Sequence, residues 1–456
     1  MRASSLLLSL PLSVFALAAC ADDTAGSGGG SAEASDSDGA SETLADSESD
    51  SDSDASESGS DSNASDSTSD TDPATDTDPA TDTDSETETD SETETETGPP
   101  PEPFCGDGNV DPDEECDDGN ANNFDGCLDD CTLVELLETT PLEWEYIEVP
   151  GTRCMNGDTA GFGVNYNPDS SNVMIYLEGG GACFSDACDF TAFNLPFIPP
   201  GDGIFSRGND NNPVRDWTMI YVPYCTGDIH AGDAERELGG QVRQFRGYSN
   251  ITTYLQQWVP SFEAERVLLT GISAGGFGAA LNTTQVANAY GEGVELTVID
   301  DSGPPLSNGV IPPCLQTLFA DTWDLPNTVL ADCPNCDPND FATDLIEHVL
   351  TDYPEVQFGL FSNTADQIIR TYMGAGWGNG QYDNCDGLSL PVPAQVYSND
   401  LNTIRASNMG EASTFYITGI GHTALRVGYN ITFADGVSLP EWIGEVLDGQ
   451  ITHVGP

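Results

Sequence analysis

The stretch Arg266-Val-Leu-Leu-Thr-Gly-Ile-Ser273-Ala-Gly-Gly-Phe-Gly-Ala-Ala-Leu281 predicts a strand, a sharp turn and a helix in close succession. The aliphatic run before the turn is typical of a buried strand. Gly271 and Gly275 flank Ser273 in a G-x-S-x-G pattern, so the backbone can turn tightly before the helix begins. This pattern indicates a nucleophile elbow, a strained turn that exposes a serine hydroxyl at the edge of a sheet. The alternative is a glycine-rich turn with an incidental serine.

Short apolar runs alternate with helical patterns through the rest of residues 140–456. The predicted strands lie at 173–177, 219–222, 267–270, 296–300, 356–362 and 414–418, and the predicted helices at 249–259, 276–289, 340–351 and 439–447. This alternation predicts one α/β domain, with a parallel sheet covered by helices on both faces. Together with the elbow, it resembles the α/β-hydrolase fold. Sites in such sheets form at the carboxyl ends of the strands.

An elbow serine needs a base, and the chain contains only four histidines. His422 follows a predicted strand and has glycine neighbours that free the backbone to present its imidazole, so it is the first candidate. The alternative is a solvent-exposed loop histidine, and His230 is the second candidate. His348 lies in a helical pattern and His453 at the end of the chain, so neither is expected to act as the base.

The acid that orients the base is expected between the serine and the histidine in chain order, at the end of a strand. Asp366 fits this place, because an apolar strand ends at 362 and a helical pattern begins near 366. It would hold the histidine tautomer and stabilise the imidazolium. The alternative is an aspartate that only caps the helix. Asp324 and Asp340 are weaker candidates for the same role.

Stabilising the tetrahedral oxyanion calls for backbone N–H groups beside the serine. The strand at 173–177 ends in three glycines, and the N–H groups of Gly180 and Gly181 can point into the site without obstruction by side chains. With the N–H of Ala274 they form the candidate oxyanion hole. A flexible turn at the end of the strand is the alternative.

Several of these motifs resemble those of the pectin acetylesterase/Notum family. They are Leu-Glu-Gly-Gly-Gly-Ala-Cys-Phe at 177–184, Val-Pro-Tyr-Cys-Thr-Gly-Asp at 222–228, Gly-Ile-Ser-Ala-Gly-Gly at 271–276, Asn-Thr-Ala-Asp-Gln at 363–367 and Gly-His at 421–422. The resemblance implies a serine esterase that needs no metal or organic cofactor, with Ser273, Asp366 and His422 as the triad and Gly180, Gly181 and Ala274 as the oxyanion donors. It also implies disulfides between Cys154 and Cys225 and between Cys183 and Cys188. The family usually has an aromatic residue within the glycine motif. Ala182 follows the glycines here, so we expect a more open pocket mouth.

The N-terminus has the pattern of a targeting segment. Arg2 precedes a short apolar run, which ends in Leu-Ala-Ala-Cys20 and resembles a bacterial lipobox. Residues 1–19 are therefore expected to be a lipoprotein signal peptide and Cys20 the lipidated residue, although an ordinary secretory signal would look similar. Residues 20–103 contain 27 acids and no base, and such a tract cannot bury enough apolar surface to fold. We expect a disordered linker.

Charge restricts the partners of the folded part. The whole chain has a net charge of -67 and contains no lysine. Residues 132–456 contain 41 acids and 10 arginines, a balance of about -31. Nucleic acid is excluded as a natural ligand, because binding it depends on neutralising phosphates. A polyanionic substrate is disfavoured for the same electrostatic reason.

The cysteine count favours an oxidising compartment. Without Cys20, the 13 cysteines leave an even number, four in 105–131 and eight beyond. Residues 104–133 resemble the myxococcus-type cysteine-rich repeat of bacterial surface proteins, and two disulfides would staple so short a unit. Its acidic and amide side chains, at Asp117, Asp118, Asn120 and Asp125, are expected to serve as turn residues rather than as calcium ligands.

Two functional hypotheses follow. The first is a surface-exposed, outer-membrane-anchored ester hydrolase that deacetylates an O-acylated polysaccharide through an acyl-enzyme, with a small acyl ester or a lipidated surface molecule as the alternative substrate. The second is a non-catalytic adhesin or carbohydrate-recognition protein on a hydrolase scaffold. Under either hypothesis, Asp228, His230 and Tyr248 could line a carbohydrate cleft.

Overall fold

The computed structural model describes residues 104–456, except 187, 191–196, 198, 200, 376, 378–384, 386–389 and 409. The chain divides into two units, Met1–Thr93 and Glu94–Pro456, and every described residue lies in the second. The predicted signal peptide, Cys20 and the predicted linker therefore fall outside the described residues. No helix in the described part is both long and apolar enough to cross a membrane.

A nine-stranded, mostly parallel sheet organises the fold, with the strand order β1-β2-β6-β3-β9-β10-β11-β12-β15. All neighbours from β6 to β15 are parallel, whereas β1 and β2 extend one edge in antiparallel pairing. The strands of the sheet are β1 (Trp144–Glu148), β2 (Gly161–Asn165), β3 (Asn172–Leu177), β6 (Thr218–Val222), β9 (Arg266–Ile272), β10 (Glu295–Asp301), β11 (Gln357–Asn363), β12 (Ala412–Ile417) and β15 (His453–Val454). The predicted α/β class is confirmed.

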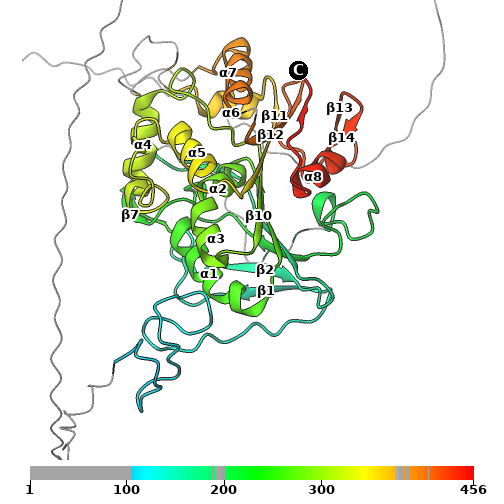
Figure 1. Ribbon diagram of the computed structural model, residues 1–456. Helices are drawn as coiled ribbons and strands as arrows, with labels where there is room; N and C mark the ends of the chain where they lie inside the picture. Colours follow the sequence, from blue (N-terminus) through cyan, green and yellow to red (C-terminus); the bar gives the residue numbers. More distant parts are fainter. Residues whose placement is uncertain are drawn as a thin grey trace, which may run out of the picture. The chain divides into compact units, whose positions relative to one another are not determined.

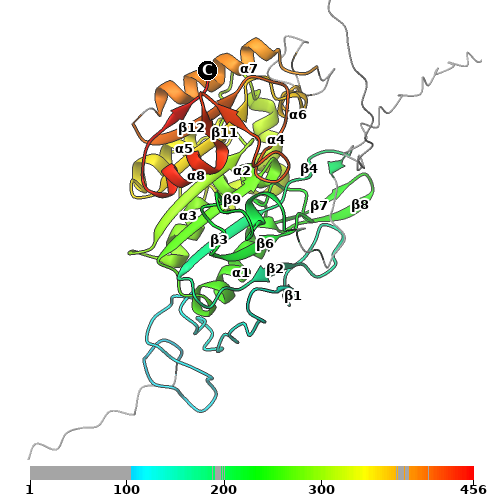
Figure 2. The same cartoon turned by 90° about the vertical axis from the view of Figure 1, so that its right-hand side faces the viewer.

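Helices cover both faces of this sheet. Figure 1 shows α1 to α5 on one face and α8 on the other, and Figure 2 looks onto the sheet from the side of α8. The helices are α1 (Gly247–Ser261), α2 (Ala274–Leu281), α3 (Thr283–Tyr290), α4 (Pro313–Trp323), α5 (Phe341–Asp352), α6 (Gln367–Tyr372), α7 (Ala394–Ser407) and α8 (Leu439–Leu447). Short elements complete the described part: β4 (Gly181–Ala182), β5 (Asp189–Phe190), β7 (Ala234–Leu238), β8 (Gln241–Phe245), β13 (Phe433–Ala434), β14 (Val437–Ser438), η1 (Gly203–Phe205) and η2 (Leu325–Asn327).

Two apolar cores form on the two faces, because side chains alternate along a buried strand. In β3, Val173 and Ile175 belong to the larger core under α1 to α5, and Met174 and Tyr176 to the smaller core under α8. Strands buried on both faces read as continuous apolar runs, which is why they could be predicted from the sequence.

The single helix predicted over 276–289 is wrong, because the chain forms two helices that meet at Asn282. The amide of Asn282 donates to the carbonyl of His230 at 3.0 Å and to that of Gly278 at 2.7 Å. An asparagine that bonds backbone groups in this way competes with a continuous helix.

Six disulfides are present in the described part. Cys154–Cys225 and Cys183–Cys188, which the family resemblance implied, are both formed. Cys105–Cys131 encloses Cys116–Cys127 in the cysteine-rich segment, and the remaining bonds are Cys314–Cys385 and Cys333–Cys336. In the cysteine-rich segment, Asp117 accepts hydrogen bonds from four backbone N–H groups, so this carboxylate shapes a turn.

Candidate active site

Ser273 lies between β9 and α2 in a strained backbone conformation, with φ 54° and ψ -120°. A non-glycine residue rarely adopts a positive φ, and the cost is of the order of 1–3 kcal/mol. The flanking glycines are needed for close packing. A Cβ at Gly275 would overlap the carbonyl oxygen of Leu177, and one at Gly271 would overlap that of Gly275. The local geometry is therefore that of a nucleophile elbow.

Asp366 and His422 meet directly. The Nδ1 atom of His422 lies 2.7 Å from Oδ2 of Asp366, and the Asp366 side chain is fully buried. The second carboxylate oxygen accepts the N–H groups of Ile368 and Ile369 at 2.9 and 3.0 Å, so Asp366 also caps α6. Asp366 thus caps the helix, as the alternative predicted, and contacts His422 through its other oxygen. An Nδ1–H donor leaves Nε2 of His422 as the proton acceptor, and that buried atom has no hydrogen-bond partner in the described part of the chain.

A shared turn connects the serine and the histidine. The N–H of Ser273 donates to the carbonyl of Asp301 at 2.8 Å, and the N–H of Thr423 donates to Oγ of Ser302 at 3.2 Å. The backbone that carries Ser273 and the residue after His422 are thus bonded to two consecutive residues at the end of β10. The structure therefore gathers the three candidate triad residues at the carboxyl edge of the sheet, and their catalytic roles stay a prediction.

The candidate oxyanion donors lie at the same edge. Gly181 and Ala274 line one pocket together with Ser273, and Gly179 packs so closely that an added Cβ would lie 2.9 Å from Cβ of Ser273. Ala274 is the first residue of α2, where backbone N–H groups have no partner within the helix. Gly180 follows in the same glycine run.

Glu178 fixes the strand that leads into these glycines. Its buried carboxylate accepts the hydroxyl of Tyr221 and Nη1 of Arg426, each at 2.9 Å. Burial raises the pKa of Glu178, and the Arg426 guanidinium opposes that rise. Because Arg426 lies four residues after His422, this ion pair joins the end of β3, just before the glycine run, to the loop that contains His422.

His230 does not have the surroundings of a base. Its Nε2 atom lies 2.8 Å from the carbonyl oxygen of Glu178, and burial lowers the pKa of His230 to about 4. It therefore stays neutral at ordinary pH and holds the peptide before the glycine run. Asp340, one of the weaker acid candidates, precedes α5, and Asp324 ends α4 in the left-handed conformation. His348 pairs with Asp352 within α5.

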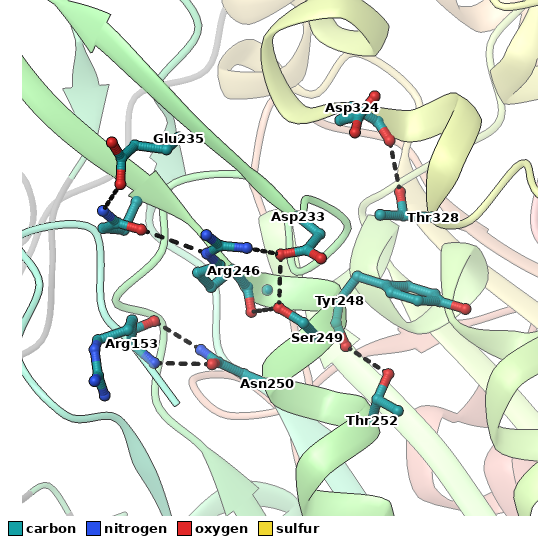
Figure 3. Close-up of polar contacts among 12 residues, drawn as sticks. Arg153, Asp233, Glu235, Arg246, Tyr248, Ser249, Asn250, Thr252, Asp324 and Thr328 are labelled. Atoms are coloured by element: carbon teal, nitrogen blue, oxygen red, sulfur yellow. Dashed lines mark hydrogen bonds and ion pairs between the residues drawn. The ribbon is translucent and has the colours of Figure 1, made fainter. Parts of the chain in front are cut away.

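The predicted carbohydrate cleft at 228–250 is wrong for two of its three residues. Asp228 and His230 are buried, and burial raises the pKa of Asp228 to about 6. Figure 3 shows Tyr248 near this region, with its ring directed away from the paired side chains of Asp233, Arg246 and Ser249. These polar groups bond to one another, so the segment is chiefly a structural network.

An apolar pocket opens beside Ser273. Aliphatic and aromatic side chains of α2, α4, α5 and α6 dominate its lining, among them Phe277, Leu281, Phe319, Trp323, Leu345, Ile346 and Ile369. Residues from α4 and α5 were not predicted as site residues, because an apolar pocket wall and an apolar core have the same sequence pattern. The polar Asp301-Ser302 at the end of a predicted strand was a usable signal that the sequence prediction missed.

A mostly parallel sheet, a strained serine at its carboxyl edge and an Asp–His pair at the same edge together resemble the arrangement of an α/β-hydrolase site. Consistent with this, residues 142–336 match the family model of the pectinacetylesterases. The match includes Ser273 and the glycine run and ends before Asp366 and His422.

Individual relatives extend the comparison. The chain is 32% identical over 168 residues to palmitoleoyl-protein carboxylesterase notum2 of Xenopus laevis, covering 33% of this chain and 34% of that protein. It is 28% identical over 173 residues to human palmitoleoyl-protein carboxylesterase NOTUM, covering 34% of each chain. It is 25% identical over 171 residues to pectin acetylesterase 4 of Arabidopsis thaliana, covering 34% of this chain and 41% of that one. The chain thus spans about a third of the length of the animal relatives it matches.

Proposed function

We propose that this protein is a serine carboxylic-ester hydrolase that works through an acyl-enzyme. The observation that carries the proposal is the hydrogen-bonded Asp366–His422 pair at the sheet edge where Ser273 occupies a strained elbow. The similarity of residues 142–336 to pectinacetylesterases supports the same reaction class.

The reaction would proceed in two halves. Nε2 of His422 takes the proton of Ser273 as Oγ attacks the ester carbonyl, and Asp366 stabilises the imidazolium that forms. The N–H groups of Gly180, Gly181 and Ala274 stabilise the oxyanion. The histidine returns the proton to the leaving alcohol, and water then hydrolyses the acyl-enzyme with the same histidine as base.

The pocket favours an apolar acyl group longer than acetyl. An acetyl group would leave most of the apolar lining from α4 and α5 uncovered, and each buried methylene contributes about 0.8 kcal/mol. The names of the animal relatives describe a palmitoleoyl-protein carboxylesterase, which is consistent with a long acyl chain. Deacetylation of an O-acetylated polysaccharide is the second candidate, because the family model and the plant relative are pectin acetylesterases.

The N-terminal pattern completes the proposal. A lipidated Cys20 followed by an acidic linker would hold the hydrolase at the surface of the outer membrane. The negative charge of residues 132–456 favours neutral substrates over polyanionic ones.

The test uses p-nitrophenyl esters from acetyl to dodecanoyl, alongside acetylated glycans, with the wild-type chain and Ser273→Ala. Ser407→Ala, at an exposed position at the end of α7, is the matched control. We expect Ser273→Ala to lower kcat/KM by at least about 10³-fold, and a fluorophosphonate probe to label Ser273 in the wild type only. Equal rates in wild type and Ser273→Ala would refute the proposal, and rates no higher than background in both would favour the recognition-protein alternative.

A further inference from the structure

Asp301 contacts both sides of the candidate active site. It is the last residue of β10, which pairs in parallel with β9, the strand that leads into the elbow. Its carbonyl oxygen accepts the N–H of Ser273 at 2.8 Å. The main chain of Asp301 therefore fixes the position of the serine.

The side chain of Asp301 points to the other half of the site. Its Oδ2 atom accepts the N–H groups of Ala424 at 2.7 Å and Leu425 at 2.8 Å. Its Oδ1 atom accepts the hydroxyl of Ser302 at 2.9 Å, and Oγ of Ser302 in turn accepts the N–H of Thr423 at 3.2 Å. Three consecutive N–H groups directly after His422 are thus bound by two adjacent residues.

Backbone strain concentrates at this junction. Ser273, Ser302 and Thr423 all have a positive φ, at 54°, 72° and 57°. Such conformations persist only where surrounding contacts enforce them, and they cluster at functional sites. The hydrogen bonds of Asp301 and Ser302 are contacts of this kind, because they bind the strained segments on both sides.

The Asp301 carboxylate is buried and accepts several hydrogen bonds. Asp301 and Ser302 are fully buried, and burial raises the pKa of Asp301 to about 6, while the bonds from residues 424, 425 and 302 and the electrostatic interaction with His422 oppose that rise. Burying a carboxylate is unfavourable unless it is well hydrogen-bonded. The three hydrogen bonds that Asp301 accepts offset this cost.

We propose that Asp301, acting with Ser302, is a positioning residue that sets the separation between the Ser273 hydroxyl and the His422 imidazole. Asp366 orients the ring through Nδ1, whereas Asp301 holds the backbone that carries it. The inference rests on the proposed esterase function, since the two side chains it aligns are the nucleophile and base of that reaction.

The test compares the full-length wild-type chain with Asp301→Ala, Asp301→Asn and Ser302→Ala. Asp210→Asn, a change at a carboxylate whose side chain is 92% exposed, is the matched control. We expect Asp301→Ala to lower kcat on a p-nitrophenyl ester by about 10²-fold, since a misplacement of 1 Å can have this effect. KM should change little, because the acyl pocket on α4 and α5 is untouched. Asp301→Asn should recover most of the loss, because its amide oxygen can accept the N–H groups of residues 424 and 425. Ser302→Ala should lower kcat less, since it frees only the N–H of Thr423.

Hydrogen exchange supplies a readout that does not depend on activity. We expect the amides of residues 423–425 to exchange faster in Asp301→Ala and to stay protected in Asp301→Asn and Asp210→Asn. Unchanged exchange at 423–425, or an unchanged kcat in folded Asp301→Ala, would overturn the positioning role. If Asp301→Ala does not fold, Asp301→Asn decides the question. Faster amide exchange at residues 423–425 in that variant, or a kcat below about a tenth of the wild-type value, would overturn the positioning role. A wild-type chain that hydrolyses no ester would instead refute the proposed function, and the exchange data would still decide whether Asp301 holds the loop.

Discussion

A larger side chain in the acyl pocket should change which esters the protein prefers. Ala342 lines the pocket from the first turn of α5, and a phenyl ring at this position would occupy space that an acyl chain needs. The relevant comparison is between acetyl and hexanoyl esters of the same alcohol. These differ by four methylenes, and only the longer chain reaches beyond the site of reaction.

The expected magnitude follows from apolar burial. At about 0.8 kcal/mol per methylene, hexanoyl should gain roughly 3 kcal/mol over acetyl in transition-state binding, or about 200-fold in kcat/KM. In Ala342→Phe we expect this preference to fall below about tenfold, while the rate on the acetyl ester stays within about threefold of wild type. Ala406→Phe, at an exposed position on α7, is the matched control.

The assay is steady-state hydrolysis of both p-nitrophenyl esters by the wild type and the two variants, with melting temperatures measured in parallel. Two results would refute the reasoning. The first is a wild-type protein with no preference for the longer chain. The second is a folded Ala342→Phe that loses activity equally on both esters, because the ring would then block the reacting carbonyl rather than the acyl chain.

Three other changes have calculable effects. Asp366→Asn should lower kcat by about 10³ to 10⁴-fold, since an asparagine presents an amide to His422 and disfavours the productive tautomer. The melting temperature should change little, because an asparagine can still cap α6. A near-normal kcat would contradict the role of Asp366 as the acid. Urea unfolding of wild type and His230→Gln at pH 7.5 and pH 5 should show the stability advantage of the wild type shrinking by about 2 kcal/mol at the lower pH. The folded-state pKa of His230, about 4, lies below its unfolded value of about 6.5, so stability is lost as pH falls through this window; an advantage independent of pH would show that His230 is not buried as a neutral group. Replacing both cysteines of Cys154–Cys225 by serine should lower the unfolding free energy by about 4 kcal/mol, and the same change at Cys183–Cys188 by about 2 kcal/mol, because the closed loops span 71 and 5 residues. The reverse order would show that native-state contacts, not loop closure, determine the loss of stability.

The sequence predicted most of the parallel sheet, because its central strands are buried on both faces and read as unbroken apolar runs. It was weaker at the sheet edge, where β1 is only half-buried and pairs in antiparallel fashion with β2. The β7–β8 hairpin was also missed, although Gly239 and Gly240 both adopt the positive φ of a tight hairpin turn. The two adjacent glycines are a local sequence signal for this hairpin turn.

The residues of the candidate site also differ in how far the sequence could predict them. Ser273, Asp366 and His422 could each be predicted because short motifs at strand ends identify them one at a time. The pocket walls could not, since nothing local distinguishes Phe319 or Leu345 in a pocket from the same residues in a core. Contacts such as Arg426 with Glu178 join residues 248 positions apart, and only the folded chain shows them together.

The strained backbone at Ser273 also bears on how this site persists over evolutionary time. Selection for stability alone would place glycine at position 273, because glycine adopts a positive φ without steric penalty. A serine at this position therefore lowers the stability of the fold. A lineage that kept only the scaffold, for adhesion or display, would be free to relieve that strain by one substitution.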